Sequence, residues 1–152
     1  MRYERVRTIL QQLTPAYHRR VRSYYEQLAE TDASPRVRMM LDYLIDHEEE
    51  RARALGEFCH AAPHQVLDLW LKGLEIDFPV AAAEILSPVA ATDLDQLVKA
   101  AVAYNLILIN YFAHLCEHSS DLRTSNLFQT LKTQEERAMK RMVRHAQGLA
   151  DL

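Results

Sequence analysis

Apolar residues at helical spacing lead into a glutamate in two separate stretches of the chain. Leu44 precedes Glu48 by four residues, and Leu131 precedes Glu135 by the same interval. Residues three, four and seven apart share one face of a helix, so each glutamate lies on the stripe that we expect to face a core. Burying a carboxylate is costly unless a partner compensates it. The pattern therefore predicts two helices with inward glutamates that need partners.

The same periodicity predicts helices over residues 2–13, 15–31, 35–58, 92–117 and 122–145, the last extending to His145 or beyond. Thr14-Pro15 predicts either a new helix start or a kink, and Thr92-x-x-Asp95 resembles a capping box that opens the fourth of these helices. Prolines and a glycine interrupt residues 59–91, where we expect only short helical pieces at 65–72 and 80–86. A short loop, a long crossover and a second short loop predict two helical hairpins joined into an antiparallel four-helix bundle.

The two hairpins also match each other at a fixed offset of 87 residues. The matching positions, without gaps, are Ala16, Tyr17, Tyr24, Leu28, Glu30, Arg36, Leu44, Glu48 and Glu49 against Ala103, Tyr104, Tyr111, Leu115, Glu117, Arg123, Leu131, Glu135 and Glu136. Amphipathic spacing alone would align apolar positions, but it does not demand the charged matches. We interpret the chain as a duplicated hairpin.

Composition agrees with one all-α domain over residues 1–152. The chain is 49% hydrophobic and has three glycines and five prolines, and it lacks the alternating β-branched runs of strands. Its formal charge of -3 gives no general field for nucleic acid, and the basic run from His18 to Arg22 is simplest as one solvated helix face. We expect neither a nucleic-acid partner nor a membrane partner.

The chain starts with charged residues, no stretch reaches the length of a membrane span, and Cys59 and Cys116 have no framework spacing. These features predict a cytoplasmic protein with reduced thiols that serve in packing. No glycine-rich phosphate loop, nucleophile elbow or Cys-x-x-Cys indicates catalysis.

On these residues the chain resembles the ferritin-like superfamily, particularly its rubrerythrin-like members. The resemblance implies a glutamate on the first and third bundle helices and a Glu-x-x-His on the second and fourth, six ligands around two iron or manganese ions. Here the second and fourth motifs read Glu48-x-x-Arg51 and Glu135-x-x-Ala138. The places of the two lone glutamates hold His18 and Asn105.

Only Glu48 and Glu135 therefore match the six ligands, so the di-metal site is degenerate. Two divalent ions bring four positive charges, whereas these glutamates supply two negative ones and Arg51 adds a positive one. We expect Arg51 to take the place of the metal, with its guanidinium bridging the two glutamates and with His18 and Asn105 completing the hydrogen bonds. That cluster has a net charge near -1, or zero once His18 is protonated. The alternatives are that the glutamates are half-exposed partners of surface arginines, or that Arg51 extends outward to solvent.

The sequence thus favours a non-enzymatic interaction or regulatory protein with no catalytic residue, metal or cofactor. The resemblance implies a homodimer, and an unknown protein partner would use Trp70 with Leu67, Leu69 and Leu71. The alternative is a metal-binding protein or oxidoreductase in which His18, Glu48 and Glu135 hold one iron or manganese ion while Arg51 swings away. A third class is a carrier of a small ligand among the tyrosines.

Overall fold

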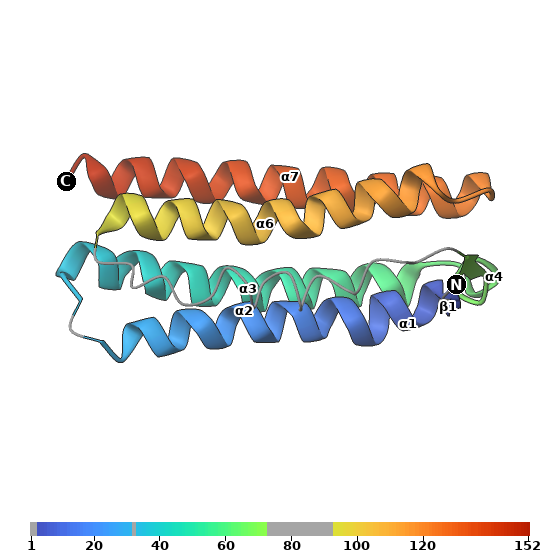
Figure 1. The fold of residues 1–152 in the computed structure, drawn as a ribbon, viewed down its shortest axis with the longest axis horizontal. Helices are drawn as coiled ribbons and strands as arrows, with labels where there is room; N and C mark the ends of the chain where they lie inside the picture. Colours follow the sequence, from blue (N-terminus) through green and yellow to red (C-terminus); the bar gives the residue numbers. More distant parts are fainter. Residues whose placement is uncertain (1–2, 32, 73–92) are drawn as a thin grey trace.

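Four long helices make up most of the protein and lie side by side along its long axis (Figure 1). The computed structural model describes residues 3–31, 33–72 and 93–152. The long helices are α2 (Thr14–Ala29), α3 (Pro35–Ala61), α6 (Leu94–Glu117) and α7 (Leu122–Ala150). The shorter elements are β1 (Tyr3–Arg5), α1 (Val6–Thr8), the π-helix η1 (Ile9–Leu13), α4 (His64–Leu67) and β2 (Trp70–Lys72). The prediction of an all-α protein is confirmed at this level.

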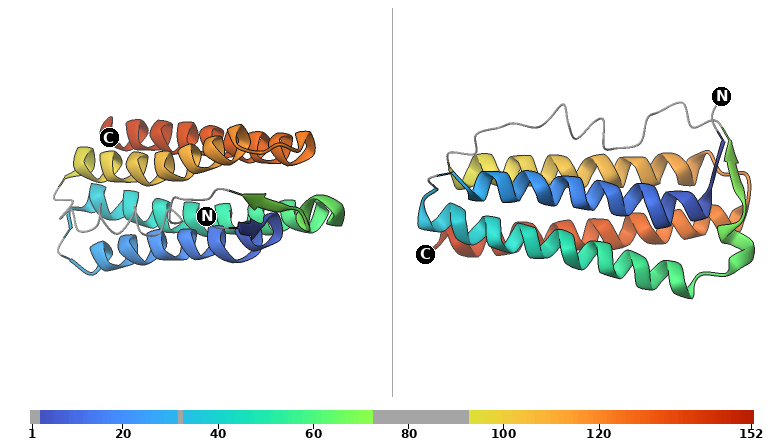
Figure 2. Two further views of the ribbon diagram at one scale, coloured as in Figure 1. Left: turned by 45° about the vertical axis from the view of Figure 1, so that its right-hand side comes forward. Right: turned by 90° about the horizontal axis from the view of Figure 1, so that it is seen from below.

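The long helices pack as two antiparallel pairs, α2 with α3 and α6 with α7, and α3 also contacts both helices of the other pair. The left-hand view of Figure 2 shows the same pairing. Helix α6 begins at the end of the molecule where α3 begins, so these two helices run in the same direction (Figure 1). All four helices therefore contribute side chains to one shared interior.

Polar side chains fix where three of the long helices begin. Ser34 accepts a hydrogen bond from the backbone N–H of Val37, and Asp121 accepts from the backbone at the start of α7. The predicted cap at Thr92 is wrong in position: α6 starts at Leu94, and Asp93 is the residue that accepts from the N–H of Gln96, at 2.8 Å. Thr92 itself lies outside the described residues.

The prediction of a helix over residues 2–13 is wrong for its first turn. Tyr3–Arg5 is instead a strand, paired antiparallel with Trp70–Lys72. The helical piece predicted over 65–72 is accordingly limited to α4, and the N–H of Val6 donates to the carbonyl of Leu69 at 3.0 Å. The piece predicted over 80–86 lies outside the described residues.

Pro15 neither starts a capped helix nor ends the preceding one. The backbone stays helical from Val6 to Ala29, and no side chain caps α2. Proline removes one backbone N–H and its ring crowds the carbonyl four residues earlier. The wider π-helix Ile9–Leu13, immediately before Pro15, accommodates this change without a break.

The buried positions repeat between the two hairpins at the offset of 87 residues. Leu10, Thr14, Tyr17, His18, Val21, Tyr24, Tyr25, Val37, Met40, Leu41, Leu44, Glu48, Arg51, Leu55 and Cys59 are all buried, and so are Leu97, Ala101, Tyr104, Asn105, Leu108, Tyr111, Phe112, Thr124, Leu127, Phe128, Leu131, Glu135, Ala138, Met142 and Ala146. The hydroxyl of Tyr17 donates to the carbonyl of Tyr104, its own counterpart, at 2.6 Å. Equivalent residues therefore meet at the centre of the interior.

Helix α6 is more apolar than we predicted from the sequence. By length and composition alone this helix could cross a membrane, so the prediction that no stretch reaches that length is wrong. Helices in the core of a soluble protein satisfy the same criterion, and 44% of its 18-residue apolar segment is buried inside the protein.

Candidate functional site

The five residues predicted for the former metal site come from all four long helices and are all buried. His18 lies on α2, Glu48 and Arg51 on α3, Asn105 on α6 and Glu135 on α7. None of them is more than 7% exposed. The two glutamates therefore face the interior, and the alternative in which they are half-exposed partners of surface arginines does not hold.

Each glutamate has its own cationic partner. Nδ1 of His18 lies 2.6 Å from Oε2 of Glu48, and Arg51 donates from Nε and Nη2 to Oε1 of Glu135 at 3.1 and 3.0 Å. Arg51 therefore points inward, contrary to the outward alternative. The predicted bridge between both glutamates is wrong, because His18 of α2 already pairs with Glu48 and the guanidinium of Arg51 extends from α3 to α7.

Asn105 also departs from its predicted role. Its Nδ2 donates to the carbonyl of Ala101, one turn earlier in the same helix, at 2.8 Å. Such a bond satisfies a buried polar side chain locally. Among the described residues no hydrogen bond joins Asn105 to either glutamate, so Asn105 does not complete their hydrogen bonds.

The electrostatic balance of the cluster is close to neutral. Burial lowers the pKa of His18, but the hydrogen bond and the negative charge of Glu48, together with the charge of Glu135, outweigh burial and leave that pKa raised. The raised pKa favours the protonated form of His18 beside the Glu48 carboxylate. With His18 protonated, two cations, His18 and Arg51, face two anions, Glu48 and Glu135, in an interior where an unpaired charge would be costly.

Three further polar residues border this cluster and were not among the predicted site residues. Burial and the charge of Glu48 raise the pKa values of the Tyr17 and Tyr25 hydroxyls, so both stay protonated. Burial lowers the pKa of His47, which keeps that imidazole neutral. His47 is buried as well. Its position three residues after Leu44 was the signal in the sequence, since that spacing also lies on the inner face.

Some polar atoms around the cluster have no hydrogen-bond partner among the described residues. They are Nε2 of His18, Oε2 of Glu135, the hydroxyl of Tyr25 and Nε2 of His47. Arg51 contacts only one oxygen of Glu135, so this is not the two-oxygen fork that gives the strongest guanidinium pairs. Arg51 therefore compensates the charge of Glu135, but it hydrogen-bonds only one of the two carboxylate oxygens.

The residues present do not fit the di-metal centre that the family resemblance implies. Within residues 3–31, 33–72 and 93–152, no group of three or more histidines, cysteines, aspartates or glutamates is placed to hold a metal ion. His18, Glu48 and Glu135 consequently do not form the three-ligand set of the alternative iron or manganese site. One of these carboxylates is bound by an imidazole and the other by a guanidinium.

The predicted partner surface around Trp70 is also smaller than expected. Trp70 is 59% exposed, but Leu67 and Leu71 are buried in the core. The guanidinium of Arg5 lies 4.8 Å from the centre of the Trp70 ring, an arrangement that allows a cation–π contact. Leu69, the third predicted leucine, is partly buried and packs against the same core. Leu67 and Leu71 therefore anchor α4 and β2 to the helices and do not extend an apolar patch.

Comparison with known proteins gives no relative: no protein-family model, no curated protein and no solved structure matches the chain. The resemblance to ferritin-like proteins rests on the motifs around Glu48 and Glu135 and on the order of the helices.

Proposed function

We propose that the chain is a ferritin-like four-helix bundle that has lost its di-metal centre and works as a non-enzymatic interaction or regulatory protein, as a homodimer. The observation that carries this proposal is that each retained glutamate already has a buried partner within the chain, His18 for Glu48 and Arg51 for Glu135. A metal ion would have to displace both. The site then has a structural role.

The two ion pairs are suited to such a role because they join different helices. His18–Glu48 links α2 to α3, and Arg51–Glu135 links α3 to α7. Buried ion pairs add little net stability over apolar packing, but misplacing one partner leaves a buried charge and is strongly unfavourable. The pairs therefore favour one arrangement of α2, α3 and α7 over shifted ones.

Metal analysis tests the proposal. The protein would be purified without a metal-binding tag, incubated with Fe²⁺, Mn²⁺ or Zn²⁺, dialysed and examined by elemental analysis. We expect the wild type to retain far less than one ion per chain. Arg51→His, which restores Glu-x-x-His on α3 and removes the guanidinium, is expected to retain more metal. Arg53→His, an exposed position on the same helix, is the matched control and is expected to behave as wild type.

Stoichiometric iron or manganese in the wild type, lost on Glu48→Ala, would overturn the proposal. The chain would then be a metal protein, and redox assays would follow.

A further inference from the structure

The outer surface of α6 differs sharply from that of α2, its counterpart in the other hairpin. One stripe along α6 consists of Lys99, Val102, Leu106, Asn110, Ala113 and Glu117, spaced by three or four residues. None of these six residues is buried, and Leu106 is 40% exposed. We call this set the α6 stripe.

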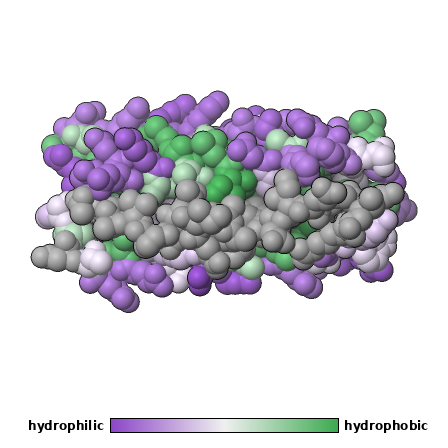
Figure 3. All heavy atoms as spheres, viewed as in Figure 1, coloured by the Kyte–Doolittle hydropathy of each residue, from purple (hydrophilic) through white to green (hydrophobic). Residues whose placement is uncertain are grey.

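The counterparts of the α6 stripe, 87 residues earlier on α2, carry charge. Leu106 corresponds to Arg19, Ala113 corresponds to Glu26, and both α2 residues are exposed. Between Lys99 and Glu117 helix α6 has no Asp, Glu, Lys or Arg at all, whereas the matching segment of α2 has four. Figure 3 shows hydrophobic side chains gathered over the middle of the α6–α7 pair, among hydrophilic ones. A helix face that only contacts solvent does not need to lack charged residues in this way.

We infer that the α6 stripe is the contact surface of a homodimer, in which α6 packs antiparallel against α6 of a second copy. This inference rests on the homodimer proposed above and adds its face and orientation. In a two-fold interface the same patch must complement itself. A central segment without charge does so, because no like charges are brought together when it meets its own copy.

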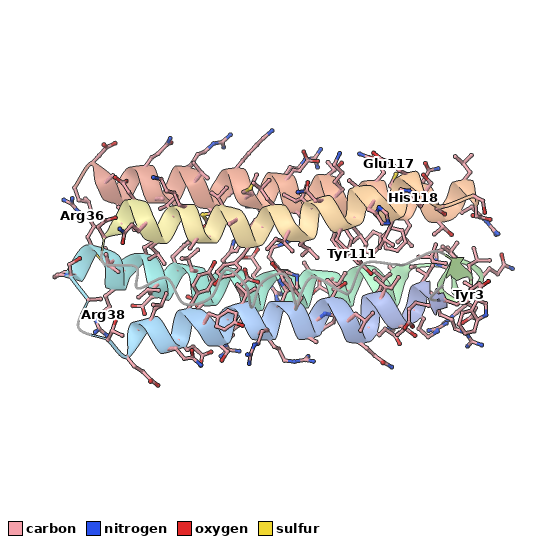
Figure 4. All side chains as sticks on the ribbon, viewed as in Figure 1. Tyr3, Arg36, Arg38, Tyr111, Glu117 and His118 are labelled. Carbon is pink, nitrogen blue, oxygen red and sulfur yellow. The ribbon has the colours of Figure 1, made fainter. Side chains whose placement is uncertain are left out.

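The charges at the two ends of the stripe select the antiparallel orientation. Lys99 lies near the start of α6 and Glu117 at its end, where Figure 4 labels it. Antiparallel packing centred on residue 108 places Lys99 opposite the second copy's Glu117 at both ends of the contact. Parallel packing would oppose lysine to lysine and glutamate to glutamate, which electrostatic complementarity disfavours. In the same register Ala113 of the stripe would lie opposite Ala103, which flanks the stripe, and these small side chains would permit close approach of the helices.

The size of the stripe indicates a modest affinity. From Lys99 to Glu117 it is roughly 27 Å long at the helical rise, and with a helix diameter of about 10 Å it offers roughly 300 Å² per copy. Stable interfaces bury about 800 Å² per partner. The dimer should therefore dissociate on dilution.

Sedimentation velocity of the full chain, over about 5 to 500 µM, tests the inference. We expect the wild type to shift from monomer to dimer with concentration. Leu106→Arg, which copies the residue at the matching place on α2, should weaken dimerisation at least about tenfold, since an Arg at the centre would be buried without a partner. Leu122→Arg is the matched control, because Leu122 is 74% exposed and lies outside the stripe, and it should dimerise as wild type.

Charge reversal keeps the test independent of the Leu106 variant, should that variant fold poorly. Lys99→Glu and Glu117→Lys should each weaken the dimer, and the double variant should recover it. Recovery is specific to the antiparallel orientation, because parallel packing keeps like charges together in all three variants.

A wild type that stays monomeric to the highest concentration overturns the inference, whatever other protein or lipid the face binds. Dimerisation that Leu106→Arg leaves unchanged, or that the double charge reversal fails to restore, overturns it too. Metal analysis of the same samples separates the two proposals: a monomer without metal contradicts only the dimer face, and a dimer with stoichiometric metal contradicts the lost metal centre.

Discussion

Removing the guanidinium of Arg51 should destabilise the fold by an amount set by the burial of its partner. Arg51→Met keeps an unbranched apolar side chain of similar reach but leaves the carboxylate of Glu135, which is only 4% exposed, without its cation. Removing one partner of a buried pair costs about 3–5 kcal/mol. Because Arg51 contacts only Oε1 of Glu135, we expect a loss near the lower end, about 3 kcal/mol.

The double variant Arg51→Met with Glu135→Met separates this cost from packing. Replacing both charges by apolar groups of similar volume is often neutral or stabilising, so the double variant should recover most of the loss. Urea denaturation followed by helical circular dichroism measures each free energy of unfolding. In a thermal scan, a loss of about 3 kcal/mol corresponds to a decrease in Tm of roughly 6–12 °C for a chain of this size.

Arg53→Met provides the control on the same helix. Arg53 and Glu57 form an exposed pair with 3.8 Å between Nη1 and Oε1, and such pairs contribute at most about 1 kcal/mol. If Arg51→Met proves as mild as Arg53→Met, the buried Arg51–Glu135 pair does not carry the energy that this reasoning assigns to it.

Two further predictions concern neighbours of this pair. The pKa of His18 is raised in the folded protein, so its ion pair with Glu48 should contribute fully below about pH 6.5 and lose that contribution as the pH rises through the folded-state pKa. Urea denaturation of wild type and His18→Gln across this range should give a stability difference that shrinks with rising pH, and a difference independent of pH would contradict the assignment. Tyr17→Phe removes the hydroxyl that donates to the Tyr104 carbonyl and should cost about 0.5–1.5 kcal/mol. An unchanged urea midpoint for that variant would show that this buried hydrogen bond makes no net contribution to stability.

The positions of the long helices could be predicted because periodicity and capping act locally. Ser34-Pro35 and Asp121 mark helix starts through contacts within three residues, and those signals are complete in the sequence. The strand at Tyr3–Arg5 could not be found in this way. Its partner lies 67 residues further along the chain, and three residues are too few to show alternation.

The same limit applies to the candidate site. Helical spacing favoured inward positions for Glu48 and Glu135, because it fixes the direction of each Cα–Cβ bond, but it left open whether the long side chain of Arg51 extends inward or outward. It does not fix which acceptor a long, flexible arginine side chain reaches. That choice depended on His18, which comes from another helix and occupies Glu48. Asn105 likewise donates to a carbonyl of its own helix, which helical spacing alone did not indicate.

Arg51 and Ala138 occupy equivalent positions in the two hairpins, and the difference between them limits how symmetric the two hairpins can be. Ala138 is fully buried, and it lies at the place that a second arginine would take if the hairpins were identical. Two identical hairpins meeting as separate molecules would bring two guanidiniums to one interior, where their repulsion is poorly screened. A single central arginine requires two halves that differ, as they do within this one chain. The chain can therefore adopt an arrangement that no symmetric dimer of identical hairpins can reach.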